Sequence, residues 1–230
     1  MPNGSTADAG DTAPAASPFL VTGLPIVPGN MFTLSATGLV SFRPDRTFYP
    51  PDGGPSTAHR AGAENGMGNF TAPLNALLGV FLNDAQPNLS ASPPAFPYLP
   101  DASIIAPSLK QVFFIGNGLT TTNSIQRVIV PQGATRFFFG VMDGFEWTNN
   151  VGSFAVSIEP IPTLAIRKLS STNVQVSWTT NAPSYRLDST DSLPAAIWNA
   201  MTNTPATVGS EFVVTVGIPG SQRYFRLRKP

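Results

Sequence analysis

Proline and glycine recur throughout this chain, and their spacing restricts its fold more than any other sequence feature. The 230 residues include 24 Pro and 20 Gly, many of them at the ends of short runs of β-branched and aromatic residues. Proline lacks a backbone donor and glycine is common in turns. This punctuation favours many short strands over helices.

The apolar runs between the turns predict a first group of strands that pack in two layers. Three consecutive phenylalanines at 137–139 cannot alternate between a buried and an exposed face, so their strand is predicted to be covered on both faces. That covering fits a two-layer sandwich. The predicted strands are 17–21, 31–36, 40–42, 77–82, 112–116, 126–130, 137–142 and 154–158. Residues 43–70 are predicted to be loop.

Residues 159–162, Glu-Pro-Ile-Pro, form a stiff joint that predicts a domain boundary. Beyond the joint the pattern changes, and Trp178 falls on the apolar face of an alternating run, where we interpret it as a core residue. This part resembles the small fibronectin-type-III-like modules that end many secreted bacterial proteins. The predicted domains are a flexible N-terminal arm (1–16), a β-sandwich (17–160) and a second, smaller β-sandwich (161–230).

Composition excludes several classes of function. The formal net charge is zero and 11% of residues are charged, so we expect no extended basic face for nucleic acid. It has no Cys and one His, which leaves few nucleophile–base pairs, and we expect no enzyme activity. No apolar run approaches the roughly 18 residues of a membrane-spanning helix. The low charge, with only three Lys, favours an exported protein at the cell surface or outside the cell.

The loop between the runs at 137–142 and 154–158 carries the most specific chemistry in the sequence. Asp143 ends the first run, and Asn149 and Asn150 precede a Gly-Ser-Phe that opens the second. Two β-rich runs around a polar loop predict neighbouring antiparallel strands, with the three side chains on one rim. One carboxylate and two amide oxygens suit calcium. The structural alternative is a loop in which Asp and Asn bond their own backbone.

This loop resembles the calcium loop of the LecA-like (PA-I-like) galactose-binding lectins, in which an Asp, a gap and an Asn pair precede Gly-Ser-Phe. The resemblance covers about residues 17–160 and implies an all-β, galactose-binding-like jelly-roll sandwich that holds Ca²⁺. It implies side-chain ligands from Asp143, Asn149 and Asn150, and backbone carbonyl ligands from Phe42 and from either Glu146 or Trp147. The candidate sugar contacts are His59, Asp52 and Gly144.

The expected function is therefore that of a calcium-dependent, galactose-type carbohydrate-binding module in an extracellular bacterial protein. Its partners would be glycans, together with further copies of itself in a homo-oligomer or an extracellular assembly. The alternative is a structural or adhesive subunit of a filament or surface layer, in which calcium only rigidifies the fold. The proline-rich insertion at 83–110 extends the binding site or forms a contact between subunits, and the sequence leaves these two roles open.

Overall fold

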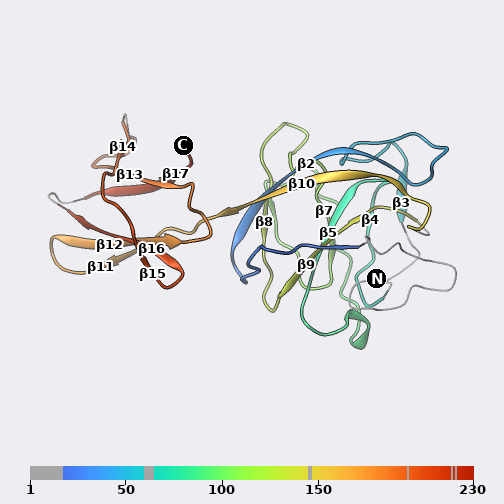
Figure 1. Cartoon of the computed structure of the whole chain (residues 1–230), viewed down its shortest axis with the longest axis horizontal. Helices are drawn as coiled ribbons and strands as arrows, with labels where there is room; N and C mark the ends of the chain where they lie inside the picture. The colour runs from blue at the N-terminus through green and yellow to red at the C-terminus, as the bar shows by residue number, and fades with distance from the viewer. Residues whose placement is uncertain (1–17, 60–64, 145–146, 196, 219, 221) are drawn as a thin grey trace. The chain divides into compact units, whose positions relative to one another are not determined.

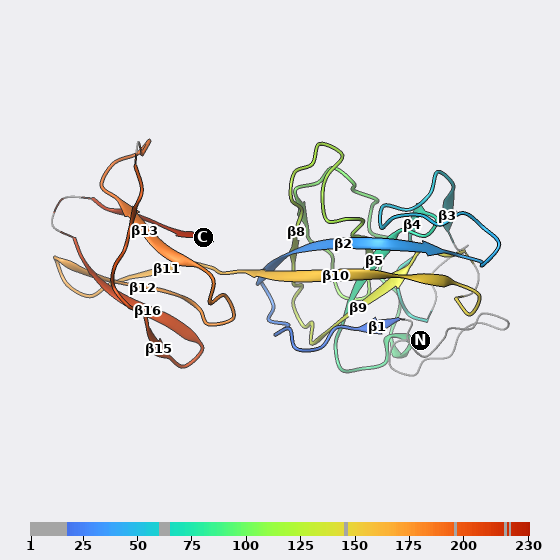
Figure 2. The ribbon, with the colours of Figure 1, turned by 45° about the horizontal axis from the view of Figure 1, so that its top comes forward.

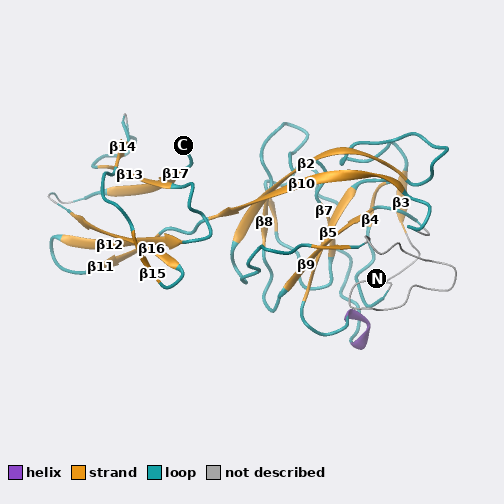
Figure 3. Cartoon of the chain, in the orientation of Figure 1, coloured by secondary structure: helices purple, strands orange, loops and turns teal. Residues whose placement is uncertain are grey.

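The structure is a computed structural model that describes residues 18–59, 65–144, 147–195, 197–218, 220 and 222–230. The predicted N-terminal arm, 1–16, lies outside these residues. Regular structure in the described part is β apart from one short 3-10 turn, Pro87–Leu89, so the all-β prediction is confirmed (Figure 3). No helix in this part is long and apolar enough to cross a membrane.

The chain divides into two compact units, Met1–Glu159 and Pro160–Pro230, and the division falls at the Glu-Pro-Ile-Pro joint. The first unit contains two four-stranded sheets (Figure 1). One has the order β1 (Phe19–Leu20), β9 (Arg136–Val141), β5 (Leu77–Leu82), β7 (Val112–Phe114). The other has the order β10 (Val151–Ile161), β2 (Met31–Ser41), β8 (Arg127–Ile129), β6 (Ile104–Ile105), with β6 parallel to β8.

A phenylalanine-rich core fills the space between these two sheets. Phe81, Phe113 and Phe137 of the first sheet are fully buried, and the rings of Phe81 and Phe137 stack with centroids 4.5 Å apart. Phe32 of the second sheet packs on the same cluster, 5.5 Å from Phe137. Offset aromatic pairs at these distances add to the stability gained by burying their surface. The two-layer prediction for this unit is therefore confirmed.

The strand that holds the phenylalanine triplet, β9, is covered on both faces, as predicted. Phe137 and Phe139 belong to the cluster between the sheets, whereas Phe138 belongs to a smaller cluster with Val80 and Leu82 on the opposite face. All three phenylalanines are buried. Alternate side chains of a strand point to opposite faces, so both faces of this sheet exclude water at β9.

The proline-rich insertion at 83–110 packs onto the first unit. The ammonium group of Lys110 donates to carbonyl oxygens at Pro87, Ser90 and Ala91, the last at 2.6 Å. Apolar side chains of the insertion, Phe96 among them, pack against the core between the sheets. The bonds of Lys110 and the packing of these apolar side chains hold the insertion against the first unit.

The prediction that 43–70 is entirely loop was wrong at one place. Residues Thr57–His59 form β3, which pairs antiparallel with β4 (Thr71–Pro73). β3 gains its hydrogen bonds from a partner twelve or more residues away in the chain. A short strand made by such tertiary pairing has little signature in its own residues.

The second unit is also a sandwich of two sheets. A four-stranded sheet has the order β11 (Ala165–Lys168), β12 (Asn173–Thr179), β16 (Glu211–Gly217), β15 (Ala206–Val208), and a three-stranded sheet has the order β14 (Asn199–Ala200), β13 (Arg186–Thr190), β17 (Tyr224–Arg228). Trp178 is 2% exposed and packs with Val176 and Leu187 between them. Trp178 is therefore a core residue, as predicted.

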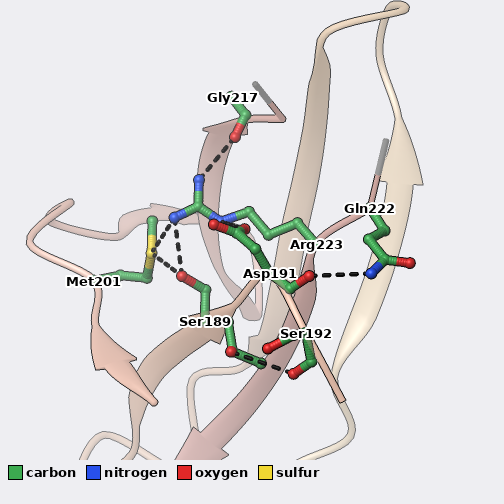
Figure 4. Close-up of polar contacts among 8 residues, drawn as sticks. Ser189, Asp191, Ser192, Met201, Gly217, Gln222 and Arg223 are labelled. Carbon is green, nitrogen blue, oxygen red and sulfur yellow. Dashed lines mark hydrogen bonds and ion pairs between the residues drawn. The ribbon is translucent and has the colours of Figure 1, made fainter. Parts of the chain in front are cut away.

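Arg223 links the two sheets of this second unit (Figure 4). Its Nη1 donates to the carbonyl oxygen of Gly217 at the end of β16, and its Nη2 donates to Ser189 Oγ on β13, both at 3.0 Å. Its Nε lies 3.7 Å from Asp191 Oδ1. A planar guanidinium bonded to both layers holds this end of a small sandwich closed.

Candidate functional site

The loop at 142–150 joins the two sheets of the first unit, which corrects the prediction that its flanking strands are neighbours. β9 lies in one sheet with β1 and β5 on its two sides, and β10 lies in the other sheet beside β2. Both edges of β9 are therefore occupied, and a hairpin with β10 is impossible. Because β10 runs alongside β2, the loop ends close to the last residues of β2 (Figure 2).

Gly152 explains how the start of β10 comes so close to β2. It has φ +89°, and a Cβ at this position would collide with the carbonyl oxygen of Leu39 and lie 3.0 Å from Val40 Cα. Only glycine combines that backbone conformation with so close an approach. The glycine after the two asparagines therefore brings Asn150 alongside Phe42, the residue that follows β2.

Four oxygen atoms from these two segments converge. The side-chain oxygen of Asn150 lies 2.8 Å from Asp143 Oδ2, 3.0 Å from the backbone carbonyl oxygen of Phe42 and 3.2 Å from Asn149 Oδ1. Asp143, Asn149 and Asn150 are each partly exposed. The structure thus brings together all three side chains and one of the backbone carbonyls that the sequence predicts as metal ligands.

The Asn150 amide can satisfy its neighbours in two ways. A half-turn about its Cβ–Cγ bond would point the amide nitrogen at the same three oxygens. That NH₂ group has two hydrogens for three acceptors, so one oxygen would remain without a donor from it. In the other orientation, the one in the structure, a cation among the oxygens would satisfy all of them together. The rotated amide satisfies both of its ends, whereas in the orientation of the structure the amide nitrogen faces only donors, so the metal alternative depends on the chemistry and spacing of the oxygens alone.

The spacing of the oxygens is compatible with a hard cation. Ligands about 2.4 Å from Ca²⁺ and separated by about 72–84° stand roughly 2.8–3.2 Å apart, as expected near the equator of a pentagonal bipyramid. Ligands of an octahedral Mg²⁺ would stand about 3 Å apart, but Mg²⁺ holds its waters more tightly and is seldom bound by an all-protein cage. One carboxylate, two amides and a carbonyl therefore fit calcium better than magnesium.

A metal site built mainly from acidic side chains would be an alternative to this cluster. In the described ranges, no three His, Cys, Asp or Glu side chains are grouped closely enough to hold a metal ion. The cluster at Asp143 differs in kind, because it combines one carboxylate with neutral amide and carbonyl oxygens. Such neutral oxygens are ordinary ligands of calcium.

The sequence also predicts a backbone carbonyl ligand from Glu146 or Trp147 in this loop. Glu146 lies outside the described residues. The carbonyl oxygen of Trp147 accepts a hydrogen bond from the backbone N–H of Asn150 at 3.2 Å, which closes a turn within the loop. The Trp147 indole lies over Gly140 of β9, 3.0 Å from where a Cβ would stand. Trp147 therefore anchors the loop to the sheet, and its role as a ligand stays a prediction.

The three candidate sugar contacts lie on separate segments. Asp52 Oδ1 accepts a hydrogen bond from the backbone N–H of Asn117 at 2.9 Å, which is a turn-stabilising role. His59 ends β3 opposite Thr71, and its side chain is outside the described part of the chain. Gly144 follows Asp143 at the start of the loop. The sugar-binding roles of all three stay predictions.

An apolar groove beside Asp143 could not be found from the sequence. Residues of three strands line it, together with Asp143 and Trp147. The strand residues that line it include Leu78 and Val80 of β5, Val112 of β7, and Phe138 and Gly140 of β9. The pairs within β5 and β9 are two residues apart, but only the order β9-β5-β7 shows that residues of the three strands share one face.

Comparison with known proteins finds no match among family models, curated proteins or solved structures. The resemblance of residues 17–160 to LecA-like lectins therefore stays a prediction from the sequence.

Proposed function

We propose that the chain is a calcium-dependent carbohydrate-binding protein of galactose type that acts outside the cell. The observation that carries the proposal is that oxygen atoms of Asp143, Asn149 and the Phe42 carbonyl all lie within 3.2 Å of Asn150 Oδ1. Four oxygens from segments a hundred residues apart in the chain form a donor set that binds Ca²⁺ in proteins.

The number of protein oxygens in the cluster suggests that a bound calcium ion would also contact a ligand from solution. Calcium takes about six to eight oxygens, so four protein oxygens leave positions for other groups. Neighbouring hydroxyls of a pyranose ring can supply two of them. The three side chains are partly exposed, so a ligand could reach the metal from solvent. The galactose preference follows only from the resemblance of the loop to the lectin family.

The first test measures calcium and sugar separately. Thermal unfolding with 1 mM Ca²⁺ or with chelator gives the metal effect, and a glycan array under the same two conditions gives the sugar effect. If calcium is present at about 100 times its dissociation constant, it stabilises the folded state by about 2.7 kcal/mol. Asp143→Asn should abolish this stabilisation and the binding of galactosides, because it removes the one carboxylate of the site.

The matched control is Asp45→Asn, which neutralises an exposed carboxylate of the same unit. It should leave both responses unchanged. Calcium stabilisation without any glycan on the array would instead support a structural metal in an adhesive or filamentous assembly. An Asp143→Asn protein that responds to calcium like the unmodified chain would remove the metal site and the proposal with it.

A further inference from the structure

The second unit carries a positively charged face, whereas the oxygen cluster at Asp143 belongs to the first unit. In the antiparallel pair β13–β17, Arg186 stands opposite Arg228 and Asp188 stands opposite Arg226. Residues directly opposite each other, and those two apart on a strand, share one face of a sheet. The four side chains therefore lie together, away from Leu187 and Leu227, which face the core of the sandwich. We call these four residues, with Trp198, the arginine face.

Asp188 holds two of these arginines in place. It is 1% exposed, and its Oδ2 accepts hydrogen bonds from Arg226 Nη2 at 3.0 Å, Arg226 Nε at 3.2 Å and Arg228 Nε at 3.1 Å. The arginine side chains remain 42% and 45% exposed. A guanidinium has five N–H donors. The described contacts use two of them on Arg226 and one on Arg228, so the outer edges can take another acceptor.

Trp198 adds an aromatic surface to the charged one. The guanidinium carbon of Arg226 lies 4.5 Å from the centre of the Trp198 ring, which is a cation–π contact. Trp198 is itself partly exposed. The stacking fixes the plane of the Arg226 guanidinium, and a planar, oriented guanidinium pairs well with carboxylate or sulfate oxygens.

The charges on this face are unbalanced. Three guanidinium groups share this face with one carboxylate, in a chain whose total formal charge is zero. Arg186 and Arg228 are like charges directly opposite each other, an arrangement that destabilises a strand pair. A bound anion would relieve this repulsion, which gives the face a physical reason to bind one.

We propose that the arginine face binds an acidic polysaccharide through its carboxylate or sulfate groups, without calcium. Duplex nucleic acid fits less well, because a neutral chain lacks the extended row of basic residues that follows a phosphate backbone. A stable protein partner fits less well too, because it needs on the order of 1,000 Å² of contact and these two strands have five residues each. Arginine clusters beside an aromatic ring suit the charged residues of such a polysaccharide.

The test measures binding of the full-length chain to heparin and to polygalacturonate by calorimetry, with chelator present throughout. Arg186→Glu is the informative variant, because Arg186 is exposed and its charge can be reversed without removing a donor from buried Asp188. It should weaken binding by about tenfold or more. Arg167→Glu is the control, since Arg167 is an exposed arginine on β11 of the other sheet, and it should bind as the unmodified chain does.

Binding should also fall as salt rises, and neutral dextran should not bind. The proposal is overturned if neither acidic polysaccharide binds, if Arg186→Glu binds as well as the control, or if polyglutamate binds more tightly than both polysaccharides. Because chelator is present, calcium-dependent binding at the oxygen cluster cannot contribute to the measured affinity. Loss of calcium-dependent galactoside binding would therefore not affect the result, and failure here would leave the calcium proposal standing.

Discussion

Gly152→Ala offers the sharpest test of how the fold builds the oxygen cluster. Gly152 has φ +89°, a conformation that costs an L-residue about 1–2 kcal/mol. Its new Cβ would also collide with the Leu39 carbonyl oxygen, which belongs to backbone and cannot rotate away. Displacing a packed strand adds about 1–3 kcal/mol. The expected loss of stability is therefore about 3 kcal/mol.

That loss can be measured as a shift in thermal unfolding of the first unit. For a unit of this size each kcal/mol moves the midpoint by about 2–4 °C, so the midpoint should fall by about 6–12 °C. The calcium-induced shift should also shrink, because moving the start of β10 carries Asn150 away from the Phe42 carbonyl oxygen. Both effects are read from the same calorimetric scans, run with calcium and with chelator.

Gly29→Ala separates backbone strain from collision. Gly29 has φ +84°, but nothing lies within 4 Å of the position its Cβ would take. This variant should therefore lose only the strain part, about 1–2 kcal/mol, and keep its full response to calcium. Equal destabilisation of the two variants would show that the collision with β2 contributes nothing. The account of how Gly152 aligns the site would then be wrong.

Three further predictions concern other parts of the chain. Gly140→Ala should push the Trp147 indole off β9, because the added methyl would stand 3.0 Å from the ring, and should weaken calcium binding measured by calorimetry. Arg223→Met should destabilise the second unit by about 1–3 kcal/mol in urea titration, since it removes charged hydrogen bonds to both sheets, whereas Arg167→Met on exposed β11 should change little. Burial and then neighbouring carboxylates raise the pKa of Tyr98, so its contribution to stability should be complete below about pH 10 and lost as pH rises through the folded-state pKa. Tyr98→Phe should make that alkaline loss of stability smaller.

Much of the fold follows from the residues of each segment alone. The phenylalanine triplet required cover on both faces, and Phe137 and Phe138 are buried on opposite faces of β9. Alternation placed Trp178 in the core of the second unit, where it is 2% exposed. Both results follow from the two-residue period of a strand, which is a local property and can be read from the sequence.

Which strands lie next to each other could not be predicted from the individual segments. The prediction that β9 and β10 pair was wrong, because β1 and β5 take both edges of β9 and β2 receives β10. β3 was missed because its hydrogen bonds come from a distant segment, β4. Strands compete for all available strand edges, so the residues of one segment do not determine which strand it pairs with.

By itself, the sequence determined which side chains can serve as calcium ligands, because residue type sets donor chemistry: Asp143 supplies a carboxylate, and Asn149 and Asn150 supply amide oxygens. It also determined the all-β class, through the spacing of its turns and apolar runs. Only the tertiary structure decided that these oxygens lie within 3.2 Å of Asn150 Oδ1 together with the Phe42 carbonyl oxygen. The physical reason is that this approach depends on β10 packing beside β2 at a glycine, a contact between segments far apart in the chain.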